Sequence, residues 1–232
     1  MADVSDRPAP ATGGCAGGWP RRRARLPYFD PVTHAVRDAY SSISEQYISL
    51  FDGTGQEHQE DAALVRRHLT GLDGPVLDLG CGPGHWTADL HSWGAAVTGV
   101  DVVPEFIAHA QAVHPGPDFQ LGSMTELDTA DHSIAGILAL YSTIHLPPSG
   151  LDRVLHEFRR LLAPDGVLVV GFFASDGDVA PFEHQVITAY RWPVNIFVEH
   201  LLAAGFVEEQ RRQHQVPERP DRMYAAVAAR AS

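Results

Sequence analysis

The stretch VLDLGCGPG, residues 76–84, decides how this chain folds. It is a short apolar run that ends in three glycines at alternate positions, and the residues after it, 85–92, are predicted to form a helix. A second apolar run over 96–101 ends in Asp101. A strand, a glycine turn, a helix and another strand are typical of a doubly wound α/β sheet, which binds its ligands at the carboxyl ends of the strands.

The same alternation continues toward the C-terminus. Further apolar strands are predicted over 119–121, 134–140 and 167–173, with helices from Pro104, over 151–162 and over 194–204. Strands that are apolar on both faces indicate a parallel sheet covered by helices on both sides. Beyond these strands the pattern weakens, and we expect an extended segment or hairpin arm over 184–192 and two closing strands over 207–216 and 223–229.

The residues before the first strand differ from this core. Residues 1–27 are rich in proline, glycine and alanine without periodicity, so we expect a disordered tail. Helices are predicted over 33–51 and 59–69, where apolar residues recur at helical spacing. The expected organisation is a tail over 1–27 and one domain over 28–232, made of an N-terminal helical cap, 28–70, and an α/β core, 71–232.

Composition limits the classes of function. The 232 residues carry a net charge of -12 with the histidines neutral, and a surface this acidic repels the phosphates of nucleic acid. The two cysteines, Cys15 and Cys81, form no CxxC pair, which favours a reducing cytoplasm. No apolar run approaches membrane-spanning length, so we expect no membrane partner. The 13 histidines show no HExxH or other ligand spacing, and we expect no metal.

The glycine turn predicts the kind of ligand. Its spacing is GxGxG, and His85 stands where a dinucleotide fingerprint has its last glycine. Asp78 places a carboxylate at the mouth of the turn, which would repel a pyrophosphate and attract an ammonium or a sulfonium. Asp101 ends the neighbouring strand, where a carboxylate can accept both hydroxyls of a ribose. S-adenosylmethionine has both cations, an adenosine and no phosphate, and it is therefore the predicted cofactor.

The sequence resembles a known family in these same segments. VLDLGCGPGHWTADL followed by VTGVD resembles the first two motifs of class I S-adenosylmethionine-dependent methyltransferases. GSMTELDTADHSIAGILALYSTIHLPP and LHEFRRLLAPDGVLVVGFF resemble the next motifs in small bacterial members, so the likeness extends over about residues 33–230. The resemblance implies a Rossmann-like sheet of seven strands whose last strand is antiparallel, and an enzyme of the EC 2.1.1 class.

Position by position, the resemblance also implies a cofactor site. The glycine turn would hold the methionine part, Asp101 would hold the ribose, and Val102 would pack on the adenine. The residues assigned to the turn and to the end of the fourth strand are Asp78, Gly80, Cys81, Gly82, Gly84, Leu140 and Tyr141.

Two parts of this site depart from the family or allow another explanation. Many members have an acidic residue near the adenine amine, where this chain has Ser123 and Met124. Ser123 would then hydrogen-bond and Met124 would pack on the ring. Tyr40 and Tyr47 resemble the paired tyrosines that close over the methionine end, but they are equally explained as core aromatics on one helix face.

Fewer residues of the sequence indicate how the methyl acceptor would be bound. His145 follows the fourth strand, where the methyl group should emerge, and an imidazole with a pKa of about 6.5 can take a proton at neutral pH. We weigh a catalytic base or substrate anchor against a loop histidine bonded to backbone. Tyr141, Tyr190 and Trp192 are expected aromatic walls, with Trp192 alternatively a plug between cap and sheet. The edge lacks the Asn/Asp-Pro-Pro-aromatic motif of enzymes that methylate nucleic-acid bases, so we expect a small-molecule acceptor.

Three functions therefore stay open from the sequence. The first is an enzyme that transfers a methyl group from S-adenosylmethionine to oxygen, nitrogen or carbon of a small molecule. The second is a module that binds the cofactor and performs no chemistry. The third is a nicotinamide-binding oxidoreductase, which the GxGxG spacing and Asp78 disfavour.

Overall fold

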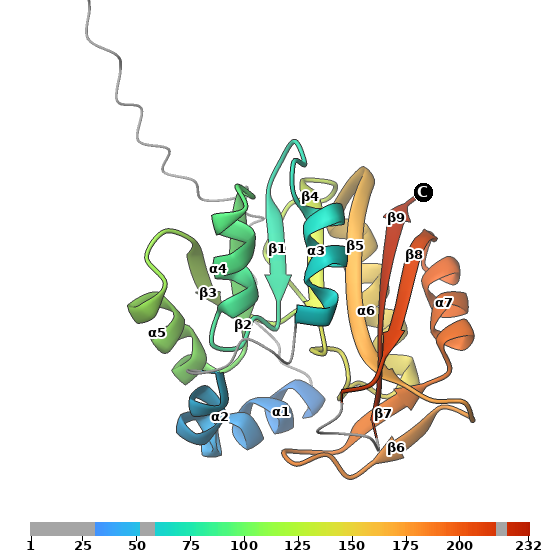
Figure 1. Ribbon diagram of the computed structural model, residues 1–232, viewed down its shortest axis with the longest axis horizontal. Helices are drawn as coiled ribbons and strands as arrows, with labels where there is room; N and C mark the ends of the chain where they lie inside the picture. The colour runs from blue at the N-terminus through green and yellow to red at the C-terminus, as the bar shows by residue number, and fades with distance from the viewer. Residues whose placement is uncertain (1–30, 52–58, 217–221) are drawn as a thin grey trace, which may run out of the picture.

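A parallel sheet forms the centre of the molecule (Figure 1), with the strand order β3-β2-β1-β4-β5. The computed structural model describes residues 31–51, 59–216 and 222–232, so the tail predicted over 1–27 lies outside the described residues. The five strands are β1 (Val76–Leu79), β2 (Val97–Asp101), β3 (Asp118–Leu121), β4 (Ile134–Leu140) and β5 (Leu162–Ala174). Every residue of β1 is buried, as expected where helices cover both faces of a sheet.

The sheet closes with an antiparallel strand, as predicted. β9 (Met223–Ala231) pairs antiparallel with β5, and β8 (Phe206–His214) pairs antiparallel with β9. The pairing with β5 extends from Met223 opposite Ala174 to Arg230 opposite Val167. The doubly wound, Rossmann-like fold class is therefore confirmed.

Two short strands raise the count from the expected seven to nine. β6 (Ala180–Phe182) and β7 (Ala189–Trp192) form an antiparallel hairpin in the region expected to be an extended segment or hairpin arm. Gly171 is the last residue of β5 that pairs with β4. β5 continues beyond it, and there β7 pairs in parallel with Phe173 and Ala174. An open strand edge leaves backbone groups without partners, and β7 supplies partners where β4 has ended.

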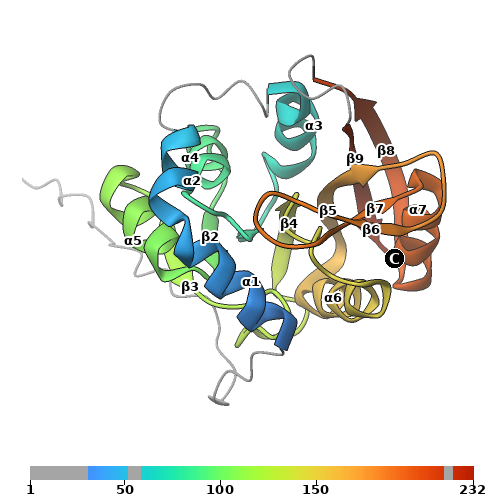
Figure 2. The same ribbon diagram turned by 90° about the horizontal axis from the view of Figure 1, so that it is seen from below.

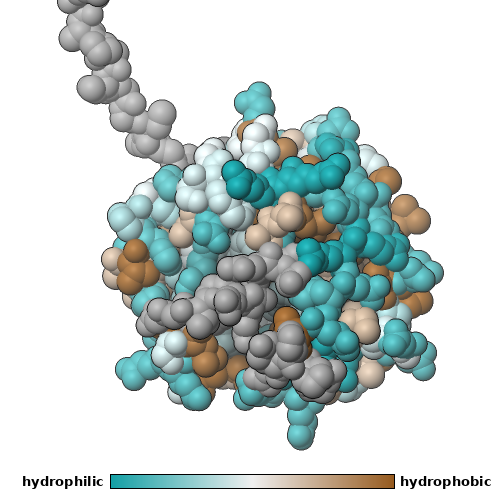
Figure 3. Space-filling model, in the orientation of Figure 1, coloured by the Kyte–Doolittle hydropathy of each residue, from teal (hydrophilic) through white to brown (hydrophobic). Residues whose placement is uncertain are grey.

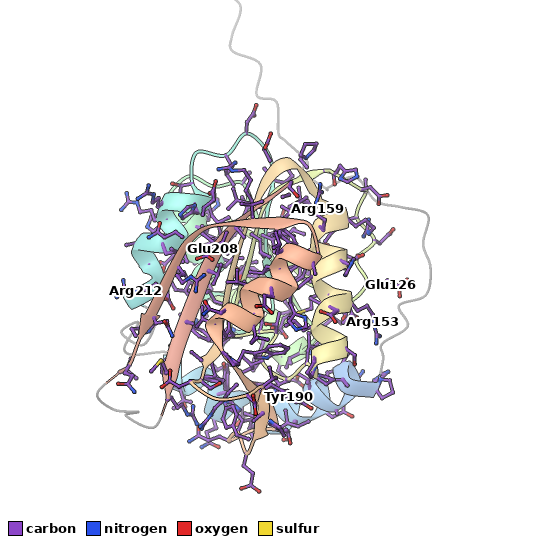
Figure 4. All side chains as sticks on the ribbon, turned by 90° about the vertical axis from the view of Figure 1, so that its right-hand side faces the viewer. Glu126, Arg153, Arg159, Tyr190, Glu208 and Arg212 are labelled. Atoms are coloured by element: carbon purple, nitrogen blue, oxygen red, sulfur yellow. The ribbon has the colours of Figure 1, made fainter. Side chains whose placement is uncertain are left out.

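Helices cover both faces of the sheet. They are α3 (Gln59–Leu69), α4 (His85–Ser92), α5 (Pro104–Val113), α6 (Pro148–Leu161) and α7 (Val194–Ala203). α3 and α6 lie on opposite faces (Figure 2), and α6 and α7 lie side by side (Figure 4). α6 is amphipathic, because its buried residues recur at three- and four-residue spacing: Leu151, Val154, Leu155, Phe158 and Leu161.

The first part of the predicted cap is not the continuous helix predicted over 33–51 but two helices, which are called the helical cap from here on, whereas α3 packs on β4, β5 and β9 of the sheet. α1 (Pro31–Ser42) and α2 (Ser44–Phe51) are separated at Ile43. The Ser42 hydroxyl donates to the Ala39 carbonyl, and the Ile43 N–H donates to the Tyr40 carbonyl only three residues back. Such short-range bonds compete with the helical ladder and bend it. α1 and α2 lie below the carboxyl ends of the parallel strands (Figure 1).

The surface shown in Figure 3 is mostly hydrophilic, with apolar residues scattered over it. The most exposed large apolar side chains of the described residues, Leu50 and Leu202, belong to different helices, α2 and α7. Within the described ranges, no helix has both the length and the apolar character needed to cross a bilayer.

Candidate functional site

A cavity of about 800 Å³ opens at the carboxyl ends of β1, β2, β4 and β5. Figure 2 looks onto this edge of the sheet, with the helical cap in front. The walls come from the cap, the glycine turn after β1, the loop after β4, and the residues around the start of β9. β1 and β4 are the neighbours at which the order of the strands reverses, and doubly wound sheets bind ligands at this point.

The three glycines of the turn have left-handed backbones but different surroundings. The backbone angle φ is +76° at Gly80, +54° at Gly82 and +97° at Gly84. An added Cβ would lie 2.3 Å from the Ser142 Cβ at Gly80, and 2.8 Å from the Phe119 ring at Gly84. At Gly82 it would meet no atom within 4 Å, and Gly82 borders the cavity. Gly80 and Gly84 therefore permit internal packing, whereas Gly82 leaves room for a ligand.

Asp101 ends β2 beside this turn and also borders the cavity. Its Oδ2 accepts a hydrogen bond from the Gly82 N–H, and its Oδ1 accepts one from the Val103 N–H, both at 2.9 Å. Burial raises the pKa of Asp101, and these backbone bonds oppose the rise. Each carboxylate oxygen keeps lone pairs for a further donor from the cavity.

A hydrogen bond joins the helical cap to the loop after β4. The Tyr40 hydroxyl lies 2.9 Å from His145 Nε2, and His145 Nδ1 lies 2.9 Å from the Thr188 carbonyl oxygen. A carbonyl only accepts, so Nδ1 carries the hydrogen and Nε2 accepts from Tyr40. Burial lowers the pKa of His145 and favours the neutral imidazole. Tyr47 packs edge-on against Tyr40, with ring centroids 5.2 Å apart.

The end of the cavity away from Asp101, beside β5 and β9, is aromatic. Tyr141, Phe173 and Tyr224 form this aromatic end, with ring centroids 5.5 to 6.1 Å apart. The Tyr141 hydroxyl donates a hydrogen bond to Oδ2 of the fully buried Asp61 at 2.6 Å. Tyr141 has a left-handed backbone, with φ +53°, which is unusual for a bulky residue. The bond to Asp61 fixes the ring in this position.

Comparisons with known proteins agree with this geometry. A family described as "Methyltransferase domain" matches residues 76–166. A trans-aconitate 2-methyltransferase of Escherichia coli O157:H7 is 52% identical over 109 residues, which are 46% of this chain and 42% of the relative. A malonyl-[acyl-carrier protein] O-methyltransferase of Yersinia pestis is 26% identical over 150 residues, 64% of this chain and 54% of the relative. The chain thus spans about half the length of the curated relatives it matches.

A solved structure extends the likeness to nearly the whole chain. It is the 1,6-didemethyltoxoflavin-N1-methyltransferase of Burkholderia thailandensis with bound 1,6-didemethyltoxoflavin and S-adenosylhomocysteine. The TM-score is 0.74 at 25% identity, over 90% of this chain and 93% of that chain. The matched family, the curated relatives and this solved structure are all methyltransferases, and together they support a class I S-adenosylmethionine-dependent methyltransferase. That structure contains S-adenosylhomocysteine, and a magnesium protoporphyrin IX methyltransferase of Synechocystis PCC 6803, with a TM-score of 0.69 at 21% identity, was solved with S-adenosylmethionine bound.

Most of the residues assigned to the cofactor from the methyltransferase motifs border the cavity. These are Tyr40, Tyr47, Gly80, Cys81, Gly82, Asp101, Val102, Met124, Leu140 and Tyr141. The open space at Gly82 and the lone pairs of Asp101 fit a ligand with a ribose. The apolar side chains of Val102 and Met124 fit a flat ring.

Asp78 lies beneath the turn and does not border the cavity. It is buried in β1, and its Oδ2 accepts a hydrogen bond from the Thr87 hydroxyl at 2.6 Å. Burial raises the pKa of Asp78 to about 7, partly offset by the Thr87 bond. Asp78 therefore braces the start of α4 in this structure. Thr87 was missed from the sequence, although its place on the first turn of the helix after the glycines was a usable signal.

Ser123 also lies outside the cavity wall. It is buried, and its hydroxyl pairs with the Thr125 hydroxyl at 2.8 Å. The neighbouring Gly122 and Met124 are the residues of this segment that reach the cavity. The contact expected of Ser123 with adenine would therefore need a different side-chain position.

The aromatic residues predicted for the acceptor separate into two groups. Tyr141 and His145 border the cavity, whereas Tyr190 and Trp192 do not. Trp192 is buried in the core against Phe197 and His200 of α7, and not between the helical cap and the sheet as its alternative supposed. Tyr190 lies on the β6–β7 hairpin at the lower edge of the view in Figure 4.

Several residues on the cavity wall or directly behind it carried no signal in the sequence. Asp61 lies in a helix whose polar side chains read as solvent-facing, and Arg222 is an isolated arginine before the last strand. Phe173 and Tyr224 were assigned only as strand residues. A position near the carboxyl end of β5 was a usable sign for Phe173, since that edge holds the ligand in this fold.

Proposed function

We propose that this chain transfers the methyl group of S-adenosylmethionine to an oxygen or nitrogen atom of a small-molecule acceptor. The observation that carries the proposal is the continuity of one cavity from Gly82 and Asp101 to His145 and the aromatic end. A donor at the first pair and an acceptor at the other end would share a single space, as an in-line displacement at carbon requires. Holding two reactants in line can supply roughly 7–11 kcal/mol of the barrier.

The chain's own residues have separate tasks in holding the donor. When bound, S-adenosylmethionine supplies a methyl group on a positively charged sulfur, which a nucleophile can attack. We assign the ribose to Asp101, the methionine part to the backbone around Gly82, and the adenine to Val102 and Met124. The assignment is supported by the position of all four residues on the cavity wall.

We assign proton removal from a hydroxyl acceptor to His145, acting through Tyr40. The neutral imidazole has its lone pair at Nε2, where the Tyr40 hydroxyl donates. As the acceptor oxygen attacks, its proton would pass to the Tyr40 oxygen while the Tyr40 proton moves to Nε2. The imidazolium would keep its Nδ1–H bond to the Thr188 carbonyl. A neutral amine needs no such base, and His145 would then only position Tyr40.

The relatives and the charge of the chain support a small acceptor. The matched proteins include one named for trans-aconitate and one solved with 1,6-didemethyltoxoflavin bound. The net charge of -12 opposes binding to nucleic-acid phosphates.

A turnover screen tests the proposal. The protein would be incubated with S-adenosylmethionine and a panel of small alcohols, phenols, carboxylic acids and amines, and release of S-adenosylhomocysteine would be measured. We expect release above the acceptor-free rate with at least one compound. Calorimetric binding of S-adenosylhomocysteine without turnover on any acceptor would favour a cofactor-binding module. Binding of NAD in place of S-adenosylhomocysteine would refute the proposal.

A further inference from the structure

Arg222 is the one arginine on the cavity wall among the described residues. It immediately precedes β9, and its guanidinium carbon lies 5.5 Å from the centre of the Phe173 ring. This stacking holds the planar group along the wall. Its Nε is buried and has no hydrogen-bond partner in the described part of the chain. A buried donor without an acceptor is destabilising, so this position calls for a ligand group.

Other arginines of the molecule differ from Arg222 in one of these respects. Arg160 forms an ion pair with Glu157 on α6. Arg191 stacks on the Phe182 ring at 4.3 Å, but it does not border the cavity. Only for Arg222, within the described ranges, do a cavity position and the lack of a carboxylate partner coincide.

The cavity carries opposite charges at its two ends. Asp101 is at the end of β2, and Arg222 is at the start of β9. The order β2-β1-β4-β5-β9 puts three strands between them, which corresponds to about 19 Å at the usual strand spacing. The wall described here holds no other aspartate, glutamate or arginine. Asp61 lies behind the aromatic end, where it accepts the Tyr141 hydrogen bond and burial raises its pKa, so Arg222 is the charged side chain of this end that borders the cavity.

We propose that the acceptor carries a carboxylate and that Arg222 binds it, which makes Arg222 a specificity-determining residue. This inference rests on the proposed function, which places the acceptor in this cavity. A planar carboxylate matches the fork of a guanidinium, and the rings of Phe173 and Tyr224 suit a flat apolar body. One guanidinium balances one negative charge. A phosphate dianion would leave a second charge uncompensated against apolar walls.

The position of Arg222 makes it an anchor at a distance from the reacting atoms. The donor would lie at the turn after β1, and β4 and β5 separate β1 from β9. That separation is about 14 Å of sheet. The bound carboxylate therefore marks one end of the acceptor, and the attacking atom belongs to its other end, near Tyr40 and His145.

Two probes of the same shape test this inference. The protein saturated with S-adenosylhomocysteine would be titrated with benzoate and with benzamide, and binding would be followed by NMR chemical shifts. We expect benzoate to bind about tenfold or more tightly than benzamide, and the ratio to fall to about one in Arg222→Gln. Arg191→Gln, on the hairpin outside the cavity, is the matched control and should keep the ratio. Arg222→Lys should keep part of it, because the charge remains without the fork.

The outcomes separate this inference from the proposed function. Equal binding of benzoate and benzamide by the wild type, or a preference for benzoate that survives in Arg222→Gln, would overturn the inference. Tighter binding of phenyl phosphate than of benzoate would overturn the carboxylate assignment. Unchanged affinity of Arg222→Gln for S-adenosylhomocysteine would show that the variant is folded and its donor end intact. If the wild type does not bind S-adenosylhomocysteine at all, the proposed function fails and this inference fails with it.

Discussion

The atoms around each glycine of the turn determine whether the missing side chain leaves room for a ligand or allows internal packing. Gly82 and Gly84 share a left-handed backbone, so either change to alanine carries a backbone cost of about 1–2 kcal/mol. Only at Gly84 does the added Cβ also overlap Phe119 and Ala110, at 2.8 Å and 2.9 Å. The pair therefore separates effects on stability from effects on binding.

We expect Gly82→Ala to stay folded and to bind S-adenosylhomocysteine at least about tenfold more weakly, because its methyl group would occupy the cavity. Gly84→Ala should unfold at a clearly lower temperature than Gly82→Ala. Thermal unfolding and calorimetry on both variants would check this. Normal affinity in Gly82→Ala would mean that the cofactor does not use this space.

Asp78 makes the stability of the protein without ligand depend on pH. Its pKa is raised to about 7 in the folded chain, above the ordinary value of 3.8, so the folded state holds this proton longer than the unfolded state does. Its contribution to stability is therefore lost as the pH rises from about 4 to about 7. Asp78→Asn should remove this part of the dependence while keeping an acceptor for the Thr87 hydroxyl.

The measurement is the unfolding temperature of the wild type and of Asp78→Asn at pH 5 and pH 8. We expect the variant to gain on the wild type as the pH rises. Asp101 also has a raised pKa, and comparing the two proteins cancels its effect. Parallel curves for the two proteins would show that Asp78 does not titrate in this range.

His145 should control turnover if the acceptor is a hydroxyl. His145→Ala should lower the rate by about 10²–10⁴-fold with little change in cofactor affinity, because general-base help is lost. The pKa of His145 is lowered by burial, so the wild-type rate should rise with pH below about 6.5 and level off above it. The variant should lose this rise. Normal turnover with an unchanged pH profile would exclude the base role.

At the scale of elements, the helical cap is held to the rest of the molecule by contacts that are distant in sequence. α1 meets the rest of the cavity wall through Tyr40, which bonds to His145 105 positions away. Tyr47 on α2 packs against Phe106 on α5, with ring centroids 5.1 Å apart. Tyr40, Tyr47 and Phe106 border the cavity, so a ligand bound beside them would add its own contacts to those that hold the cap.

Hydrogen exchange can measure this effect on the cap. We expect residues 31–51 to exchange more slowly after S-adenosylhomocysteine is added, because closure over the ligand orders α1 and α2. α7 lies outside the cavity wall and is the internal control. Equal exchange of the cap with and without the ligand would leave Tyr40 and Tyr47 as ordinary packing residues.

In the whole molecule, the sheet positions the residues that line the cavity, and the cap covers them. The parallel strands present the glycine turn, the loop after β4 and the end of β5 at one edge, and the cap covers that edge (Figure 1). The β6–β7 hairpin extends the same edge where β5 outlasts β4. Residues from different segments of the chain therefore line one cavity, as the proposed transfer requires.

The local parts of this architecture follow from the sequence. Apolar runs, glycine spacing and helical periodicity are set by neighbours within a few residues, so the order of strands and helices could be predicted, and with it the sheet edge at which Gly82 and Asp101 border the cavity. The break at Ile43 could not, because the sequence alone does not show that the Ser42 hydroxyl bonds to the Ala39 carbonyl.

The contacts that define the acceptor side were decided only by the tertiary structure. Tyr40 with His145 and Tyr141 with Asp61 join residues 105 and 80 positions apart. Arg222, which precedes β9, likewise meets the ring of Phe173 on β5. No local pattern encodes such pairs, because they depend on how the strands are ordered and where each one ends. For the same reason Asp78 could be placed beside the turn from sequence, but whether its carboxylate faced the cavity or Thr87 was settled by the packing of α4 on β1.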